Sequence, residues 1–193
     1  DFHLGTPDSG SSRKRETEII QWLTFIEKDA EELFLIGDIF DFWFEYKQAI
    51  PKGFIRLQGK IAELTDSGIP VHLFTGNHDM WIFDYLPKEL GIELHDHTIQ
   101  REFFGKKYLI GHGDGLGPGD FKYKFLKQIF RNKACQWLFA RLHPNLGIGL
   151  ASFSSKKSRA ATGKEDFVFN DINDERLFHY CQEYLKNEYV DYF

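Results

Sequence analysis

The sequence predicts an α/β fold in which strands and helices form separate layers. Two short apolar segments, 32–36 and 71–74, have the composition of buried strands, and each leads on to a segment with helical apolar spacing. Each strand ends in a glycine-containing loop that carries acidic or imidazole side chains. Strands that alternate with helices favour a sheet covered by helices. With 193 residues, 42% of them hydrophobic, the chain is long enough to bury such a core.

The other elements follow in chain order from the same spacing. A Ser-rich start precedes a helix over 13–29, and a helix over 54–66 is stopped by Gly68 and Pro70. The remaining expected elements are a helix near 81–90, strands near 97–103 and 107–111 joined by the turn Gly105-Lys106, helices over 119–142, a long helix over 172–187 and a strand beginning at 189–193.

Charge is distributed unevenly along the chain. The net charge of −5 argues against a general nucleic-acid binder. Residues 121–164, termed the basic segment below, contain no Asp or Glu and ten Lys or Arg, whereas the rest of the chain has a net charge of −15. This segregation suggests that one face meets an anionic partner. Cys135 and Cys181 are too far apart for a CxxC pair, which favours two reduced thiols in a cytosolic protein.

The two ends of the chain predict a piece of a longer protein. Asp1-Phe2-His3 stands where a strand would end, and 189–193 has the composition of a strand beginning, so we expect truncation at both ends. No signal peptide is visible, and no apolar run reaches the 18 residues that a membrane span needs.

Candidate metal ligands follow four of the expected strand exits. These are Asp1 with His3, Asp38 with Asp41, Asn77 with His78 and Asp79, and His112 with Asp114. Sites in layered α/β folds gather at such loops. Carboxylate, amide and imidazole ligands suit Mn, Fe or Zn, and a carboxylate between two ions can bridge them. The pattern therefore predicts a two-metal hydrolytic site that acts on a phosphoryl group through an activated water.

Two other motifs carry less weight. His95-Asp96-His97 lies between an expected helix and an expected strand, and we interpret it as an exposed turn. The alternating glycines of 111–119 match neither G-x-G-x-x-G nor a P-loop. We expect that they let the backbone pass close to the metal site.

Four sequence blocks contain the candidate metal ligands: D-x-H at 1–3, G-D-x-x-D at 37–41, G-N-H-D at 76–79 and G-H-x-D at 111–114. With these blocks the sequence closely resembles the calcineurin-like metallophosphoesterases. The resemblance implies a layered αββα sandwich, here one domain over 1–193 with a helical lid over about 119–164. It implies two divalent ions, with Mn²⁺ expected.

The same resemblance assigns roles to individual residues. Asp1, His3 and Asp38 would hold one metal, and Asp38, Asn77 and His112 the other, so that Asp38 is the bridge. His78 would face the scissile phosphate as an acid or charge stabiliser, and Asp79 would orient it. Asp41 and Asp114 would support the ligands from behind. The family's fifth block, G-H-x-H, is absent from the sequence, so we expect weakened metal binding and little activity in this chain.

The basic segment and its neighbours are similar to the UDP-2,3-diacylglucosamine hydrolase branch of the family. The resemblance rests on Asp120-x-x-Tyr123, the Ser- and Lys-rich stretch 154–159 and the block 37–43. It implies cleavage of the pyrophosphate of UDP-2,3-diacylglucosamine to UMP and 2,3-diacylglucosamine 1-phosphate, in lipid A synthesis. The substrate contacts that it implies are Asn77, His78, Asp120, Tyr123, Ser158 and Lys164. Members of this branch often carry Arg where His78 stands, which leaves open a divergent subgroup or another substrate.

Large apolar residues alternate with the charges of the basic segment, and two interpretations remain. Their helical spacing fits plain core packing. It also fits a lid whose apolar face binds acyl chains and whose basic rim meets the anionic cytoplasmic face of the inner membrane. No nucleic acid and no obligate protein partner are expected. The alternative functions are a soluble metallophosphoesterase acting on nucleotides or phosphoproteins, and a non-catalytic scaffold on the same fold.

Overall fold

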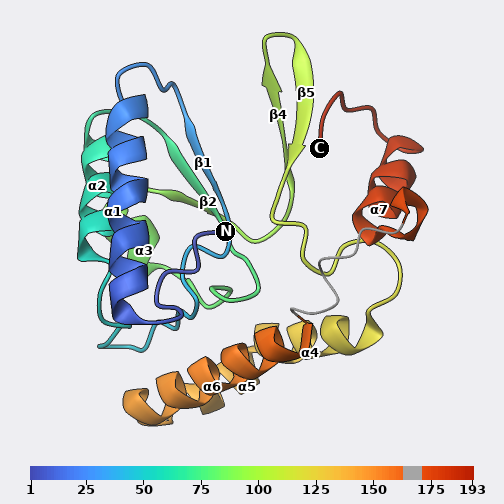
Figure 1. Ribbon diagram of the computed structural model, residues 1–193. Coiled ribbons are helices and arrows are strands. Elements are labelled where there is room, and N and C mark those ends of the chain that lie inside the picture. Colours follow the sequence, from blue (N-terminus) through green and yellow to red (C-terminus); the bar gives the residue numbers. More distant parts are fainter. Residues whose placement is uncertain (163–170) are drawn as a thin grey trace. The chain divides into compact units, whose positions relative to one another are not determined.

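The computed structural model describes residues 1–162 and 171–193, except for the side chains of 156–162 (Figure 1). The chain divides into two compact units, residues 1–97 and 98–193, referred to below as unit 1 and unit 2. No described helix is both long enough and apolar enough to cross a membrane.

Unit 1 contains a parallel sheet of three strands in the order β1 (Leu33–Ile36), β2 (Val71–Phe74) and β3 (Glu93–His95). Parallel neighbours need a crossover connection. Here α2 (Ile55–Asp66) connects β1 to β2, and α3 (Tyr85–Leu90) connects β2 to β3. The expected α/β class is therefore confirmed in this unit.

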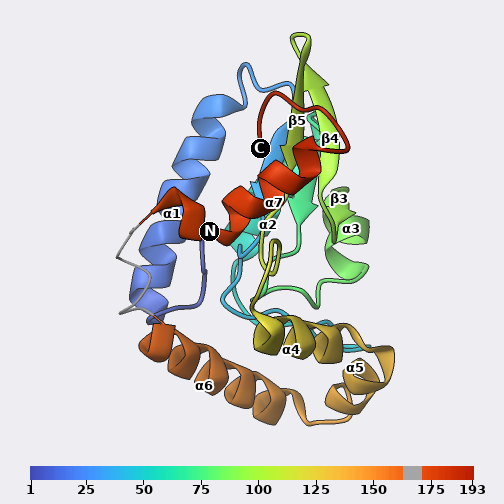
Figure 2. The same ribbon diagram turned by 90° about the vertical axis from the view of Figure 1, so that its right-hand side faces the viewer.

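The helices of unit 1 cover one face of its sheet. Figure 1 shows α1 (Ser9–Ile26) and α2 on the same side of the strands, and Figure 2 shows the ribbon turned by 90°. Alternate strand residues point toward them, so that Leu35 and Leu73 belong to the buried core and Leu94 packs against it. The helices contribute Ile19, Leu23, Leu57, Ile61, Leu64, Leu86 and Leu90 to that core. The residues between them, such as Phe34 and His72, point to the opposite face of the sheet.

Two helices of unit 1 begin at residues that sequence spacing did not indicate. The helix expected over 13–29 spans 9–26, because the Asp8 side chain accepts the free N–H groups of Gly10 and Ser11 at 2.8 and 2.9 Å. The helix expected near 81–90 begins only at Tyr85, and the Glu45 carboxylate accepts the N–H groups of residues 83, 84 and 85. A cap supplied from forty residues away leaves no local sequence signal.

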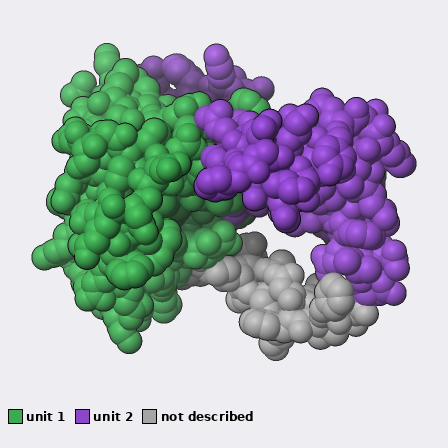
Figure 3. Space-filling model, turned by 90° about the horizontal axis from the view of Figure 1, so that it is seen from above, with its two compact units in different colours: residues 1–97 green, residues 98–193 purple. Residues whose placement is uncertain are grey.

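Unit 2, coloured purple in Figure 3, begins with an antiparallel hairpin. Strands β4 (Ile99–Phe103) and β5 (Lys106–Ile110) confirm the expected pair, and the connecting residues Phe104 and Gly105 both have positive φ. The strand expected to begin at 189–193 is reduced to one bridge, between Tyr192 and Tyr108.

Helices make up most of the rest of unit 2. They are α4 (Phe121–Arg131), α5 (Lys133–Phe139), α6 (Pro144–Thr162), the 3₁₀ turn η1 (Ile172–Asp174) and α7 (Arg176–Leu185). The single helix expected over 172–187 is wrong at its start, because Asp171 accepts the N–H of Asn173 and Glu175 is extended. Helix α6 lies within the helical lid expected over about 119–164, but its bounds were not predicted, since Gly147 and Gly149 interrupt its apolar spacing.

Candidate metal and phosphoester site

The candidate site of unit 1 forms where β1 and β2 end. Strand β1 runs into Gly37 and Asp38, and the neighbouring strand β2 leads into 76–79, so the two loops lie side by side. The start of the chain joins them, because the N–H groups of Phe2 and His3 both donate to the Asp38 carbonyl at 2.9 Å. Three of the predicted ligand blocks are thus brought to one edge of the sheet.

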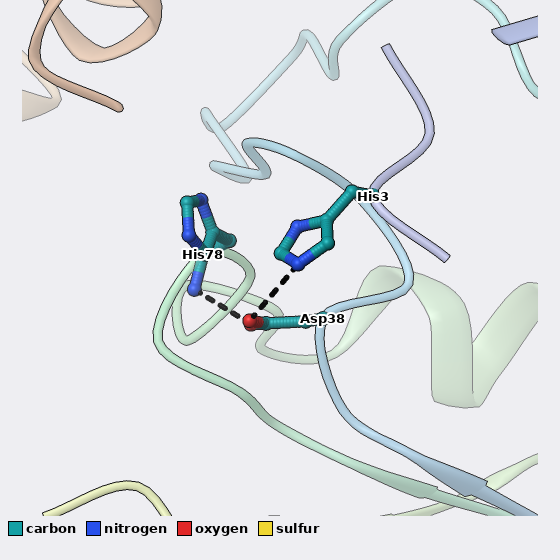
Figure 4. A group of neighbouring side chains, drawn as sticks. All are labelled: His3, Asp38 and His78. Carbon is teal, nitrogen blue, oxygen red and sulfur yellow. Dashed lines mark hydrogen bonds and ion pairs between the residues drawn. The ribbon is translucent and has the colours of Figure 1, made fainter. Parts of the chain in front are cut away.

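His3, Asp38 and His78 converge at this edge (Figure 4). The Nε2 atom of His3 lies 3.8 Å from Oδ2 of Asp38, and the backbone N–H of His78 donates to Oδ1 of Asp38 at 2.9 Å. One ligand atom from each of the three residues lies within 4.8 Å of the others. Asp1 adds a carboxylate oxygen 3.8 Å from His3 Nε2. Asp38 is buried and contacts both His3 and His78.

The backbone around the cluster is held in uncommon conformations. His3 and Asp38 have φ values of 44° and 50°, although neither is glycine. At Gly76 a Cβ atom would lie 2.1 Å from Oδ1 and 2.6 Å from the backbone nitrogen of Asp38. The glycine of the G-N-H-D block is therefore required by the close approach of the Asp38 loop.

Asp79 holds the two loops together. Its fully buried carboxylate accepts the N–H of Gly76 at 2.8 Å, of Ile39 at 2.8 Å and of Phe40 at 3.3 Å. Burial, with a smaller contribution from the Asp38 charge, raises the pKa of Asp79 to about 6, although the amide hydrogen bonds act in the opposite direction.

The ring of His78 is positioned by Asp41. His78 Nδ1 lies 3.0 Å from the Asp41 carbonyl oxygen and 3.7 Å from its Oδ1. A carbonyl can only accept, so Nδ1 carries the proton, and Nε2 is the atom through which the ring can bind a cation or exchange a proton. Asp41 thus makes the contact to the ring, whereas Asp79 holds the backbone beneath it.

The other predicted site residues fall into three groups. Asn77 lies in the unit 1 loop between Gly76 and His78, while His112, Asp114, Asp120 and Tyr123 belong to unit 2. Ser158 and Lys164 lie outside the residues whose side chains the structure describes.

Unit 2 provides partners that sequence reasoning did not identify. Asp114 accepts a hydrogen bond from the Tyr123 hydroxyl and lies 2.6 Å from Lys127 Nζ, and Asp120 lies 2.7 Å from Arg176 Nη1. Lys127 and Arg176 could not be singled out, because nothing in their local sequence distinguishes them from other surface cations.

The donor set of unit 1 fits a divalent cation. It combines imidazole nitrogen with carboxylate oxygen and contains no sulfur, as Mn, Fe and Zn sites do. The positive φ of His3 and Asp38 and the close approach at Gly76 hold these donor atoms in position without an ion.

A second group of possible ligands was missed. His72, Glu93 and His95 bring ligand atoms within 4.8 Å of one another on β2 and β3. The interpretation of 95–97 as an exposed turn is wrong for His95, which is buried at the end of β3, and holds for Asp96 and His97. Strand β3 escaped notice because it is only three residues long and two of them are polar.

Comparisons with known proteins agree with this geometry. A family model described as Calcineurin-like phosphoesterase matches residues 1–176. A curated UDP-2,3-diacylglucosamine hydrolase of Porphyromonas gingivalis is 37% identical over 205 residues, which cover 100% of this chain and 78% of that protein. A Vibrio vulnificus protein of the same name is 34% identical, over 74% of this chain and 56% of its own length. A protein of that name from Histophilus somni is 28% identical, over 97% of this chain and 78% of its own length.

Proposed function

Because this chain belongs to the calcineurin-like phosphoesterase family, we propose that it hydrolyses the pyrophosphate bond of UDP-2,3-diacylglucosamine. The products would be UMP and 2,3-diacylglucosamine 1-phosphate, an intermediate of lipid A synthesis. The match that covers the whole chain, to a protein named for this reaction, carries the proposal. The convergence of His3, Asp38 and His78 supports it, since these residues come from three separate family blocks.

Two divalent ions, with Mn²⁺ as the expected metal, complete the proposed site. Asp1, His3 and Asp38 are the proposed ligands of one ion, and Asp38, Asn77 and His112 those of the other. When bound, such ions would lower the pKa of a water molecule and offset charge on a phosphoryl group. The distances of 3.8 Å from His3 Nε2 to both Asp1 and Asp38 support the first of these ligand sets.

His78 is the proposed acid or charge stabiliser at the scissile phosphate. Its Nδ1 proton is held by Asp41, so Nε2 is the atom that, when it is also protonated, can donate a proton or present positive charge to a phosphate oxygen. Asp79 contributes by fixing the backbone of both loops through three amide hydrogen bonds. Asp41 and Asp79 therefore act as positioning residues.

Helices α4 to α6 form the proposed lid. No residue of α4 or α5 is buried, which favours an exposed lid over plain core packing. Their large exposed apolar side chains include Phe121, Phe125, Leu126, Ile129, Trp137 and Leu138, and α6 adds Leu146, Leu150 and Phe153. With the charges of the basic segment, this surface suits acyl chains and the anionic cytoplasmic face of the inner membrane. Asp120, Tyr123, Ser158 and Lys164, with Asn77 and His78, are the proposed contacts to the head group.

Release of UMP tests the proposal directly. With Mn²⁺ the purified protein is expected to show little total activity, because the G-H-x-H block is absent from its sequence. That activity should still be much higher on UDP-2,3-diacylglucosamine than on UDP-N-acetylglucosamine, which lacks the two long acyl chains. Asp38→Asn should reduce the rate by at least about a thousandfold, since it removes the bridging carboxylate. Asp66→Asn, at an exposed residue at the end of α2, is the matched control and should leave the rate unchanged. Equal rates on both substrates would instead indicate a nucleotide-directed phosphatase.

A further inference from the structure

The sheet face opposite the helices of unit 1 carries a compact cluster of nitrogen and oxygen ligands. In the register of the sheet His72 stands opposite Glu93, and Phe74 opposite His95, so both histidines and the glutamate point to this face. His72 Nδ1 lies 3.1 Å from His95 Nε2 and 3.3 Å from a Glu93 carboxylate oxygen, and His95 Nε2 lies 3.5 Å from the other oxygen.

These separations are compatible with a metal site. Ligands arranged tetrahedrally at 2.0–2.1 Å from Zn²⁺ lie about 3.3 Å from one another. We propose that His72, Glu93 and His95 bind a divalent transition-metal ion such as Zn²⁺ and thereby link β2 to β3. Two imidazoles and one carboxylate supply three ligands and leave a fourth position for water.

The hydrogen-bond arrangement around His72 matches this assignment. To bind through Nδ1, His72 must carry its proton on Nε2. That atom is buried, makes no hydrogen bond to any described residue, and lies 3.9 Å from a Glu32 carboxylate oxygen. A carboxylate beyond the distal nitrogen is the usual arrangement for a metal-binding histidine. Glu32 is therefore assigned as the residue that orients His72.

Aromatic packing holds both rings in place. Phe34 stacks on His72 with ring centroids 4.6 Å apart and nearly parallel planes, and Phe74 packs against His95 at 4.8 Å. The His72 and His95 side chains are 4% and 7% exposed, whereas that of Glu93 is 60% exposed. An ion can thus enter from the Glu93 side and meet two imidazoles that are already fixed.

This cluster is separate from the phosphoester site. His72 precedes Gly76 by four residues along β2 and the start of its loop, which corresponds to about 13 Å of extended chain. None of its three ligands belongs to a family block. The alternative is a hydrogen-bonded histidine pair, with no affinity for metal.

Cobalt titration distinguishes the two possibilities. After removal of metals with a chelator, the chain is titrated with Co²⁺, and bound equivalents and the visible absorption of four-coordinate Co²⁺ are recorded. Asp38→Asn is introduced into every variant to weaken the phosphoester site. We expect His95→Gln and Glu93→Gln each to bind one equivalent less than the Asp38→Asn parent and to lose the four-coordinate spectrum. His97→Gln is the matched control and should match the parent, since His97 is two residues away, exposed and, among the described residues, paired only with Asp96.

Zinc affinity gives a second measurement. Glu32→Gln is expected to weaken Zn²⁺ binding about 10- to 100-fold without removing it. Because Glu93 is exposed, Glu93→Gln is expected to fold normally even if a substitution at a buried histidine does not. Unchanged Co²⁺ stoichiometry in Glu93→Gln, or a loss of equal size in His97→Gln, would overturn the assignment.

Discussion

At the scale of single residues, Gly76 is the position where one added carbon should disturb the site most. In Gly76→Ala the new Cβ atom would meet both the carboxylate and the backbone of Asp38. The two loops must move apart, so we expect at least a tenfold loss of phosphoesterase activity and a fall of about 1–3 kcal/mol in the free energy of unfolding. Activity assays and urea denaturation measure the two effects.

The control for this substitution is Gly59→Ala. Gly59 lies in α2, and a Cβ atom added there meets nothing within 4 Å. Because alanine favours a helix over glycine by about 1 kcal/mol, this variant should be slightly more stable and fully active. A Gly76→Ala protein as active as Gly59→Ala would show that the approach of the two loops is not required.

Asp79 should make the stability of the metal-free protein depend on pH. Its pKa is about 6 in the folded state, against an ordinary value of 3.8. Below pH 3.8 both states are protonated, and the stabilising contribution of the neutral carboxyl is complete. Between these pKa values only the folded state keeps the proton, so the free energy of unfolding should fall by about 3 kcal/mol as pH rises through about 6.

Comparison with Asp79→Asn isolates this effect, since other carboxyl groups titrate in both proteins. Urea denaturation is measured from about pH 4 to pH 7 with a chelator present, because bound cations favour the ionised carboxylate. The free energy of unfolding of the unchanged protein, minus that of Asp79→Asn, should decrease as the pH rises. A constant difference would mean that Asp79 is already ionised in the folded protein at low pH.

Prediction from sequence of which residues lie together succeeded where the pattern is local. The glycine and acidic blocks predicted that His3, Asp38 and His78 would lie close together, because loop residues after buried strands meet at one sheet edge, and the three side chains do so. Their roles stay predictions. His95 was misjudged, since its burial depends on pairing with His72, which lies 23 residues earlier in the chain. Such a pair cannot be recognised without knowing that β2 and β3 are neighbours.

At the scale of elements, α4 offers a test of the proposed lid. Phe125 lies on this helix with 65% of its surface exposed. If the lid receives acyl chains, Phe125→Ala should raise the KM for UDP-2,3-diacylglucosamine about tenfold, because a buried phenyl ring contributes roughly 1.5–3 kcal/mol. Thermal stability should hardly change, because the side chain is exposed.

Phe104→Ala provides the matched comparison. Phe104 is 100% exposed at the turn between β4 and β5, in the same unit but outside the lid helices. This variant should keep the KM of the unchanged protein. An equal effect of both substitutions, or of neither, would argue against acyl binding by α4.

Element boundaries show what local sequence can and cannot specify. Apolar spacing located α2, β1 and β2 within about one residue, because their periodicity is regular. The starts of α1 and α3 were wrong, since they depend on capping by Asp8 and by the distant Glu45. The bounds of α6 within the expected helical lid were not predicted, because its glycines lower local helix propensity.

At the scale of the whole molecule, charge is divided between the basic segment and an acidic remainder. Composition reveals this division directly, since it needs no knowledge of contacts. The two compact units and the ion pair of Asp120 with Arg176 could not be inferred, because they depend on contacts between distant parts of the chain. The class of reaction could therefore be predicted from the sequence, whereas the side chains that surround the expected substrate contacts could not.

Charge reversal tests whether this division guides the protein to membranes. Lys122 and Lys133 are exposed in the basic segment, and Lys28 and Lys47 are exposed in unit 1. The pairs Lys122→Glu with Lys133→Glu and Lys28→Glu with Lys47→Glu change the net charge equally. If the basic segment contacts an anionic bilayer, only the first pair should weaken binding to phosphatidylglycerol vesicles, by at least tenfold, because each basic residue near such a surface contributes about 1 kcal/mol.

Binding of the unchanged protein should also weaken as salt screens the charges. Equal losses in both pairs would show that net charge, and not its location, controls binding; vesicle sedimentation at two salt concentrations separates these outcomes.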